Sequence, residues 1–192
     1  MNPEGDHEAA APSDLAGRLL VATPTLLDPN FYRTVVYLAE HGPDGALGIV
    51  LNRPTDEAVA DHIEGWSDYL AAPEVVFVGG PVSNEVAVAV AQNPAIPPES
   101  WQPQLNDVGL LDITEGPEPV GGVDRLRIFS GYAGWVTGQL ELELATGSWF
   151  VLDAVAADVF AAEPTGLWRA VLARQPGRLA FYSSFPDMLA DN

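Results

Sequence analysis

The sequence predicts an α+β protein of one domain, and three observations lead to that prediction. Short runs rich in β-branched and aromatic residues recur along the chain, and they do not alternate regularly with long helices, as a doubly wound sheet requires. The 192 residues contain no internal repeat and no linker long enough to separate two domains. Hydrophobic residues make up 47% and charged residues 18% of the chain, so it is able to build a core.

The most distinct element of the sequence is a β-hairpin near the N-terminus. Residues 18–22 predict a first strand, and residues 33–39 (RTVVYLA) predict a second one because β-branched and aromatic side chains dominate them. The turn signal Gly42-Pro43-Asp44-Gly45 follows, and residues 46–51 then predict a third strand. A connection this short joins antiparallel strands only, since a parallel pair needs a long crossover.

The middle of the chain predicts a mixture of short elements. After Asn52-Arg53-Pro54-Thr55 we expect a short helix over 56–63 with acids in its first turn, and a helical turn over 67–71. Residues 74–78 are apolar without alternation, which is typical of a strand covered on both faces. Residues 86–91 and 108–113 predict further strands, separated by a proline-rich surface loop over 93–103.

The C-terminal third predicts strands around one amphipathic helix. A strand over 125–130 leads into the glycine- and aromatic-rich segment GYAGW, residues 131–135. Leu140, Leu142 and Leu144 alternate with glutamates, a period of two that favours a half-exposed strand. Residues 149–152 predict a strand, 164–174 a helix with proline in its first turn, and 179–182 a final strand.

The opening of the chain has the composition of a disordered acidic leader. Residues 1–16 are rich in alanine, proline and acids and contain neither lysine nor arginine, so we place a single folded domain over 17–192. This opening is the reverse of a secretory signal peptide, which begins with positive charge. No apolar run reaches the 18 residues that a membrane helix needs. The sequence therefore predicts a cytoplasmic protein that does not enter a membrane.

The charge of the chain excludes several kinds of partner. Eight basic residues, all arginine, face 27 acids, and the formal net charge is −19. Nucleic acids and anionic membrane surfaces attract proteins mainly through lysine and arginine, so we expect neither as a direct partner. The absence of cysteine excludes disulfides, thiolate metal sites and thiol nucleophiles.

Motifs for enzymatic or metal chemistry are weak. No serine lies in the G-x-S-x-G setting of a catalytic nucleophile that one of the three histidines could activate. No segment matches a phosphate-binding loop, which requires a lysine. The acids near His62 (Glu57, Asp61 and Glu64) are a conceivable cation site, but a solvated acidic helix face is the favoured interpretation. We therefore expect no metal and no cofactor, and we lean against an enzyme.

Arginines and glycines provide the remaining candidates. Arg33, near Asp28, and Arg53, between Asn52 and Pro54, suit a clamp for a carboxylate or phosphate, or alternatively internal ion pairs. The Gly79-Gly80 turn and the glycines around Tyr132 and Trp135 offer backbone N–H groups to an anion, or else permit tight turns and close packing. Three further arginines, Arg169, Arg174 and Arg178, lie in the acid-free window 164–186 and suit either a helix C-terminus or a partner surface.

Three motifs resemble one known family. The segments LLVATPTLLDPNFYRTVVYLAEHGPDGALGIVLNRPT (19–55), VFVGGPV (76–82) and SGYAGWVTGQLELELATGSWF (130–150) occur in this order and closely resemble the AlgH/YqgE family of small bacterial proteins. The resemblance implies a mixed, bifurcated β-sheet that closes partly into a small barrel and is surrounded by helices. It also implies that GQLELEL forms a helix, which we prefer to the strand, with Thr137 as its N-cap.

What the resemblance implies about function is limited to a label. The family is often labelled a transcriptional regulator, from a proposed role in alginate control, but the charge of this chain argues against direct DNA binding. We favour a non-enzymatic protein that binds a partner protein or small ligand and regulates indirectly. The alternative is a small-molecule enzyme or sensor with one pocket. The candidate ligand-binding residues are Asp28, Arg33, Asn52, Arg53, Gly79, Gly80, Tyr132, Trp135, Gln139 and Glu143; the partner and the oligomeric state stay open.

Overall fold

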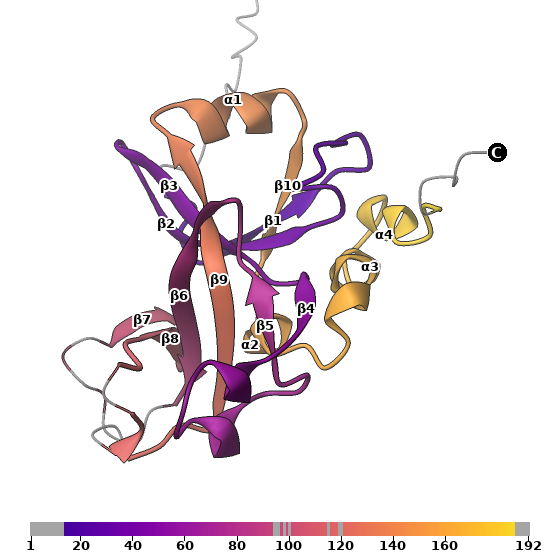
Figure 1. The fold of residues 1–192 in the computed structure, drawn as a ribbon. Coiled ribbons are helices and arrows are strands. Elements are labelled where there is room, and N and C mark those ends of the chain that lie inside the picture. The colour runs from indigo at the N-terminus through magenta and orange to yellow at the C-terminus, as the bar shows by residue number, and fades with distance from the viewer. Residues whose placement is uncertain are drawn as a thin grey trace, which may run out of the picture.

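The fold was analysed in a computed structural model, which describes residues 14–93, 97, 99, 101–114, 116–118 and 121–186. In this part of the chain ten strands form one mixed sheet, and short helices lie around it (Figure 1). The predicted α+β class is confirmed. Most of the predicted leader over 1–16 lies outside the described residues, but Leu15 at its end is 3% exposed and packs in the core. No helix in the described part is both long and apolar enough to cross a membrane.

The described residues form ten strands, four α-helices and three 3₁₀ turns. The strands are β1 (Arg18–Ala22), β2 (Val35–Gly42), β3 (Gly45–Val50), β4 (Pro54–Ala58), β5 (Val75–Val78), β6 (Val82–Gln92), β7 (Gln102–Leu105), β8 (Val108–Leu111), β9 (Arg125–Val136) and β10 (Trp149–Asp153). The helices are α1 (Gln139–Ala145), α2 (Ala156–Val159), α3 (Leu167–Ala173) and α4 (Leu179–Tyr182), with 3₁₀ turns η1 (Val59–Asp61), η2 (Ser67–Tyr69) and η4 (Pro164–Gly166).

The long strand β9 makes the sheet bifurcate. Its second half pairs with β3, with Ala133 opposite Gly48 and Val136 opposite Gly45. Its first half pairs with β6 on one side and, in parallel, with β5 on the other, where Phe129 lies opposite Phe77. The two halves of the sheet therefore share β9 and curl away from each other (Figure 1). This confirms the mixed, bifurcated sheet that the family resemblance implied.

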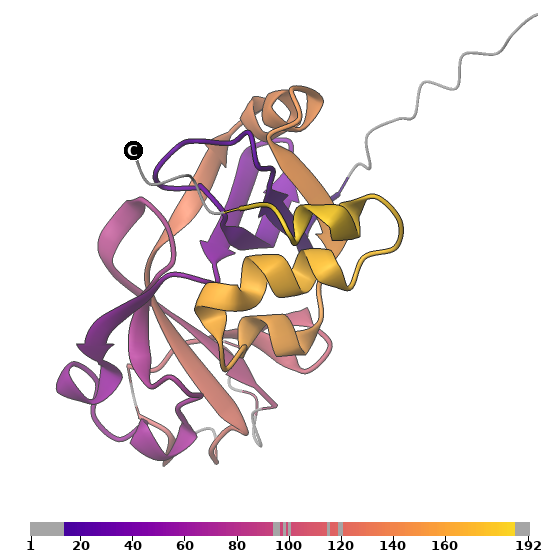
Figure 2. The same ribbon diagram turned by 90° about the vertical axis from the view of Figure 1, so that its right-hand side faces the viewer.

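The predicted hairpin is confirmed as β2 and β3, and both faces of the sheet beside it are covered. Along β1, Leu19 and Val21 belong to the core under α3, whereas Leu20 packs with Leu140 of α1 on the other face. Alternate side chains of a strand point to opposite faces, so the apolar run of β1 fits a strand buried on both sides. Helices α3 and α4, in yellow, lie over one face of the sheet (Figure 2).

Two predicted elements have the wrong secondary structure because tertiary contacts override local pattern. The expected helix over 56–63 is instead strand β4 followed by η1. Strand β4 pairs with β5, and the Thr55 hydroxyl donates to the Val76 carbonyl at 2.7 Å, which holds the segment extended. The expected final strand over 179–182 is helix α4, where Tyr182 packs against Phe150 of β10.

The segment after β9 is the helix α1, as the resemblance implied, and the strand predicted from its period-two pattern is wrong. Leu140 is buried and Leu144 half-buried, one helical turn apart, while Leu142 between them is exposed. The N-cap is Gly138, in the left-handed region at φ +76°, and not the expected Thr137. A glycine here lets the chain reverse from β9 into the helix.

Smaller differences concern the edges of the sheet. Strand β5 is not covered on both faces, because Val78 is 40% exposed. The proline-rich loop ends earlier than expected, since β7 begins at Gln102. Helix α2 carries no local signal strong enough to have been predicted.

Candidate functional site

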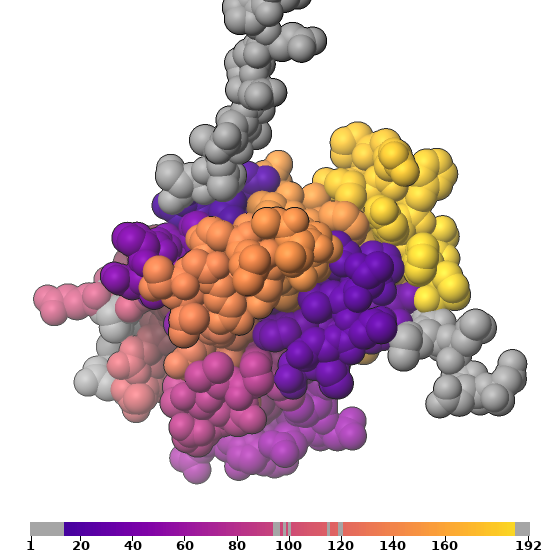
Figure 3. Space-filling model, turned by 90° about the horizontal axis from the view of Figure 1, so that it is seen from above, coloured from indigo at the N-terminus to yellow at the C-terminus, as the bar shows by residue number. Residues whose placement is uncertain are grey.

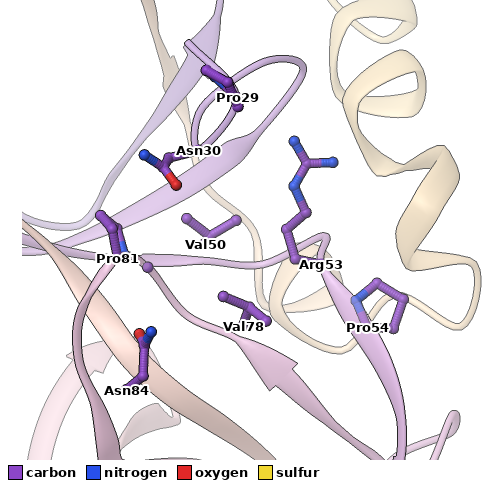
Figure 4. Close-up of a pocket in the computed structure, with 9 residues that line it drawn as sticks. Pro29, Asn30, Val50, Arg53, Pro54, Val78, Pro81 and Asn84 are labelled. Carbon is purple, nitrogen blue, oxygen red and sulfur yellow. The ribbon is translucent and has the colours of Figure 1, made fainter.

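The candidate site is a hollow where β3 and β5 end, which we call the Arg53 hollow. It has a volume of about 450 Å³ and is lined by Pro29, Asn30, Arg53, Val78, Pro81 and Asn84, among others. The loop between β1 and β2 supplies one wall and the β5–β6 connection the other (Figure 4). Seen from above, the indigo loop and the magenta start of β6 lie side by side (Figure 3).

Arg53 is the only ionisable residue that lines this hollow among the described residues. Its Nη2 donates to the carbonyl of Tyr32 at 2.5 Å, and within the described chain no carboxylate lies within 4.0 Å of it. Burial lowers the pKa of its guanidinium from the usual value, because removal from water disfavours the charged form. An anion that enters the hollow would therefore form a favourable charge-assisted hydrogen bond with this guanidinium.

A second hollow, of about 310 Å³, lies on the other side of Arg53 towards the C-terminal helices. Arg33 and Arg169 also line it, so three of the eight arginines meet there. The Arg33 guanidinium stacks 4.6 Å from the ring of Trp168 and donates to the Phe185 carbonyl at 2.9 Å. Arg169 donates to the carbonyl of Ser183. These two arginines therefore hold the end of the described chain against the domain.

Asn52 and Asp28 have structural positions beside the site. Asn52 is buried, accepts a hydrogen bond from the backbone N–H of Val35 at 2.9 Å and donates to the Arg33 carbonyl at 2.8 Å. It thereby fixes the loop against the end of β3 and aims the next residue, Arg53, at the hollow. Asp28 accepts from the N–H of Asn30 at 2.8 Å, a turn that places Asn30 at the mouth of the hollow.

Gly79 and Gly80 serve close packing. A Cβ atom on Gly79 would lie 2.3 Å from the carbonyl oxygen of Gly131, and one on Gly80 would lie 2.1 Å from the backbone of Tyr132. The Gly79 N–H donates to the Ser130 carbonyl at 2.8 Å, so it is not free to bind an anion. Gly80 lines the Arg53 hollow through its backbone, and no larger residue fits there.

The remaining predicted site residues gather at the opposite end of β3, around α1. The Glu143 carboxylate accepts from the indole N–H of Trp135 at 2.9 Å and of Trp149 at 2.8 Å, and its other oxygen accepts from Gln139 at 3.0 Å. Trp135 is buried against Trp149 and Phe31. This group, which we call the Glu143 clamp, fastens α1 to β9 and β10. Tyr132, half-buried on β9, lines neither hollow beside Arg53.

The candidates thus separate into two groups instead of one pocket. Arg33, Asn52, Arg53 and Gly80 meet beside the hollows, whereas Trp135, Gln139 and Glu143 satisfy one another at the opposite end of β3.

Sequence reasoning missed the residue Asn84, which lines the Arg53 hollow, because nothing local marks an asparagine at the start of a strand. It also missed Arg127, which is buried in the described structure and donates to the carbonyls of Ala72, Val159 and Ala161.

Other charged candidates are explained by their neighbours. Glu57 and His62 lie 3.3 Å apart and are both exposed, and in the described part of the chain no group of three or more such residues is arranged to hold a metal ion. Arg174 forms a two-pronged pair with the buried Asp158, which raises the pKa of the guanidinium mainly through their hydrogen bonds. Arg178 is exposed.

The fold and the hollow define a small α+β protein with a bifurcated sheet and a cation-bearing site where its branches separate. A family model described as AlgH-like (DUF179) matches residues 19–180, and the chain belongs to this family. UPF0301 proteins are similar over nearly all of their length. That of Streptomyces avermitilis is 48% identical, covering 91% of this chain and 94% of its own, and that of Thermobifida fusca is 44% identical, covering 90% and 92%.

Two solved structures are similar as well. A crystal structure of a Corynebacterium diphtheriae protein superposes with a TM-score of 0.82 at 30% identity and covers 92% of this chain and 94% of its own. The solution structure of the AlgH protein from Pseudomonas aeruginosa gives a TM-score of 0.68 at 29% identity, covering 94% and 98%. The family resemblance predicted from the three motifs is confirmed.

Proposed function

We propose that this protein is a non-enzymatic binding protein that holds an anionic group of its ligand in the Arg53 hollow. The observation that supports the proposal is the half-buried Arg53 guanidinium, which has one backbone partner and no carboxylate within 4.0 Å in the described structure. Arg125 and Arg127 also have no carboxylate within 4.0 Å in the described structure, but Gln92 and three backbone carbonyls satisfy them, whereas Arg53 has a single carbonyl and faces a hollow.

The chemistry around Arg53 suits binding more than catalysis. Its neighbours in the hollow are three prolines, two valines, Gly80 and the amides of Asn30 and Asn84, and none of these is a nucleophile or a general base. Apolar walls with a few polar groups are typical of ligand sites, where the polar groups fix the orientation of the ligand. Any regulatory effect would follow from the bound partner, since the charge of the chain disfavours direct contact with DNA.

The experiment is a titration with inorganic phosphate and with malonate in a low-salt buffer without other multivalent anions. Calorimetry measures the binding, and thermal unfolding measures the melting temperature at each anion concentration. We expect saturable binding, and an increase in melting temperature with anion concentration because the ligand binds only the folded state. Arg53→Gln should weaken binding at least tenfold. Arg178→Gln removes the same charge from an exposed site and is the matched control.

Binding that is absent, or that is equally strong in the Arg53→Gln and Arg178→Gln proteins, would refute the proposal. The melting temperature of each variant without ligand shows that it is folded.

A further inference from the structure

The Arg53 hollow continues along one face of β5 into a third hollow of about 290 Å³. Val78 lines the Arg53 hollow, and Val76, two residues earlier on the same face of the strand, lines the third. Asn84 lines both, and Figure 4 shows it across Val78 from Arg53. The two hollows are therefore neighbouring parts of one channel, which we call the β5 groove.

The floor and walls of the β5 groove are mainly apolar in its middle. Val76 and Val78 of β5 form the floor with the small residues Ala87 and Ser130 of the neighbouring strands. Val78 is 40% exposed and Val86, on the β6 side, is 45% exposed. Exposed valines on the two strands that flank β9 are where a partner side chain gains most from leaving water.

The two ends of the groove carry opposite charges. Arg53 stands at one end. Glu85 and Glu57 line the other end, where Glu57 is 3.3 Å from His62. Arg53 and Glu57 are four residues apart, and the pairing of β4 with β5 is irregular between Pro54 and Ala58, so this segment is shorter than the ~13 Å that four fully extended residues span. A single small anion would occupy only the Arg53 end of a groove of this length.

We propose that the β5 groove binds an extended segment of a partner protein with the pattern acid-x-apolar-x-base, in one chain direction or the other. In an extended chain residues i, i+2 and i+4 point to the same side and span about 13 Å, so an acid and a base at the outer positions reach the two charged ends while the apolar residue lies over the valines. The inference rests on the proposed function, because the acid of the segment is the anion that Arg53 binds. Complementary charges at the two ends set the register of the segment.

The test is an array of synthetic nine-residue peptides that carry Glu, an apolar residue and Lys at positions i, i+2 and i+4, in both orders. Scrambled peptides of the same composition are included. The tightest binder is then measured by fluorescence anisotropy against the full chain. We expect the patterned peptides to bind at least tenfold more tightly than the scrambled ones, and replacement of the apolar residue by serine to cost at least tenfold.

Variants of the protein separate this inference from the proposed function. Arg53→Gln should weaken both phosphate and peptide. Glu85→Gln and Val86→Ser lie outside the Arg53 hollow, so they should weaken the peptide at least fivefold and leave phosphate binding unchanged, while the exposed Glu163→Gln is the matched control. Phosphate binding without a preference for patterned peptides overturns the inference and leaves the proposed function standing. Peptide binding that is insensitive to Glu85→Gln and Val86→Ser also overturns it, and a wild-type protein that binds neither phosphate nor peptide refutes both proposals.

Discussion

The guanidinium of Arg53 combines burial with the lack of a carboxylate partner in the described structure. The sequence identified this residue as a candidate because a permanent charge beside a predicted strand end and turn suits a clamp for an anion, with an internal ion pair as the alternative. It did not indicate which residues would surround it. Asn84 and Pro29 are 55 positions apart in sequence, and they meet only because the β1–β2 loop and the start of β6 lie on either side of the same hollow. Such non-local contacts have no local sequence signal.

Tyr37 is a single buried group that makes the stability of the fold depend on pH. Its hydroxyl is buried in the core, and no hydrogen-bond partner for it exists in the described part of the chain. Burial raises the pKa of Tyr37 to about 12 from 10.0. The folded state therefore keeps the proton up to a higher pH than the unfolded state, so this contribution to stability is full below pH 10 and is lost as the pH rises towards 12.

We predict that Tyr37→Phe increases the free energy of unfolding by about 1 kcal/mol at neutral pH, because the change removes an unsatisfied buried hydroxyl. Between pH 10 and 12 the stability of the variant should fall less steeply than that of the wild type. Urea unfolding at several pH values measures both effects. Comparison of the two proteins at each pH cancels the titration of Arg127, whose pKa burial lowers to about 10. A destabilised variant with an unchanged pH profile would contradict this account.

At the scale of elements, side chains from different segments hold the short helices in place. Helix α2 has four residues and α1 has seven, too few to be stable alone. Local pattern therefore predicted them poorly. The apolar strands β1 to β3 carry strong local signals and were predicted correctly, and the predicted helix over 164–174 is present as the 3₁₀ turn η4 followed by α3. By contrast, residues 56–63 and 179–182 take their structure from pairing with β5 and packing on β10.

We predict that Glu143→Ala lowers the free energy of unfolding by about 2–4 kcal/mol. The change leaves the indole N–H groups of Trp135 and Trp149 without their acceptor at the foot of α1. Urea unfolding followed by tryptophan fluorescence measures the loss. Leu142→Ala on the exposed side of the same helix is the control and should change stability by less than about 0.5 kcal/mol. Equal effects of the two changes would show that the Glu143 clamp does not anchor α1.

We also predict that Arg127→Met lowers the free energy of unfolding by at least about 3 kcal/mol. The buried guanidinium donates to three carbonyls, of Ala72, Val159 and Ala161, and methionine leaves all three without this donor. The Arg127 guanidinium thus joins β9 to α2 and to the segment before β5. The neighbouring Arg125→Met, which removes a bond to Gln92, should cost about 1 kcal/mol or less. A loss for Arg127 no larger than that for Arg125 would contradict a structural role.

At the scale of the whole molecule, the charge of −19 decides which partners are compatible with the surface. Phosphate contacts through arginine and lysine dominate the affinity of proteins for nucleic acids. Three of the eight arginines line the hollow beside α3, and Arg174 is paired with Asp158. We expect the remaining surface to repel a polyanion.

We predict that duplex DNA of about 30 base pairs shows no gel shift with this protein at about 50 mM salt, the regime most favourable to electrostatic binding. A known DNA-binding protein in the same gel is the positive control. A shift that disappears with added salt would show that the arginines act together on a polyanion despite the net charge, and would restore direct DNA binding as a function.

The bifurcated sheet itself creates the candidate site. Strands β3 and β5 pair with different parts of β9, and Arg53 lies where they separate. The central claim is that this guanidinium binds an anion, and NMR of the arginine side chains tests it most directly. With eight arginines and no lysine, few such signals overlap. We predict that malonate shifts the Arg53 Nε–H signal together with the backbone amides of Asn30 and Gly80, along one saturable curve. A shift of Arg178 equal to that of Arg53, or no saturation at either residue, would contradict the account.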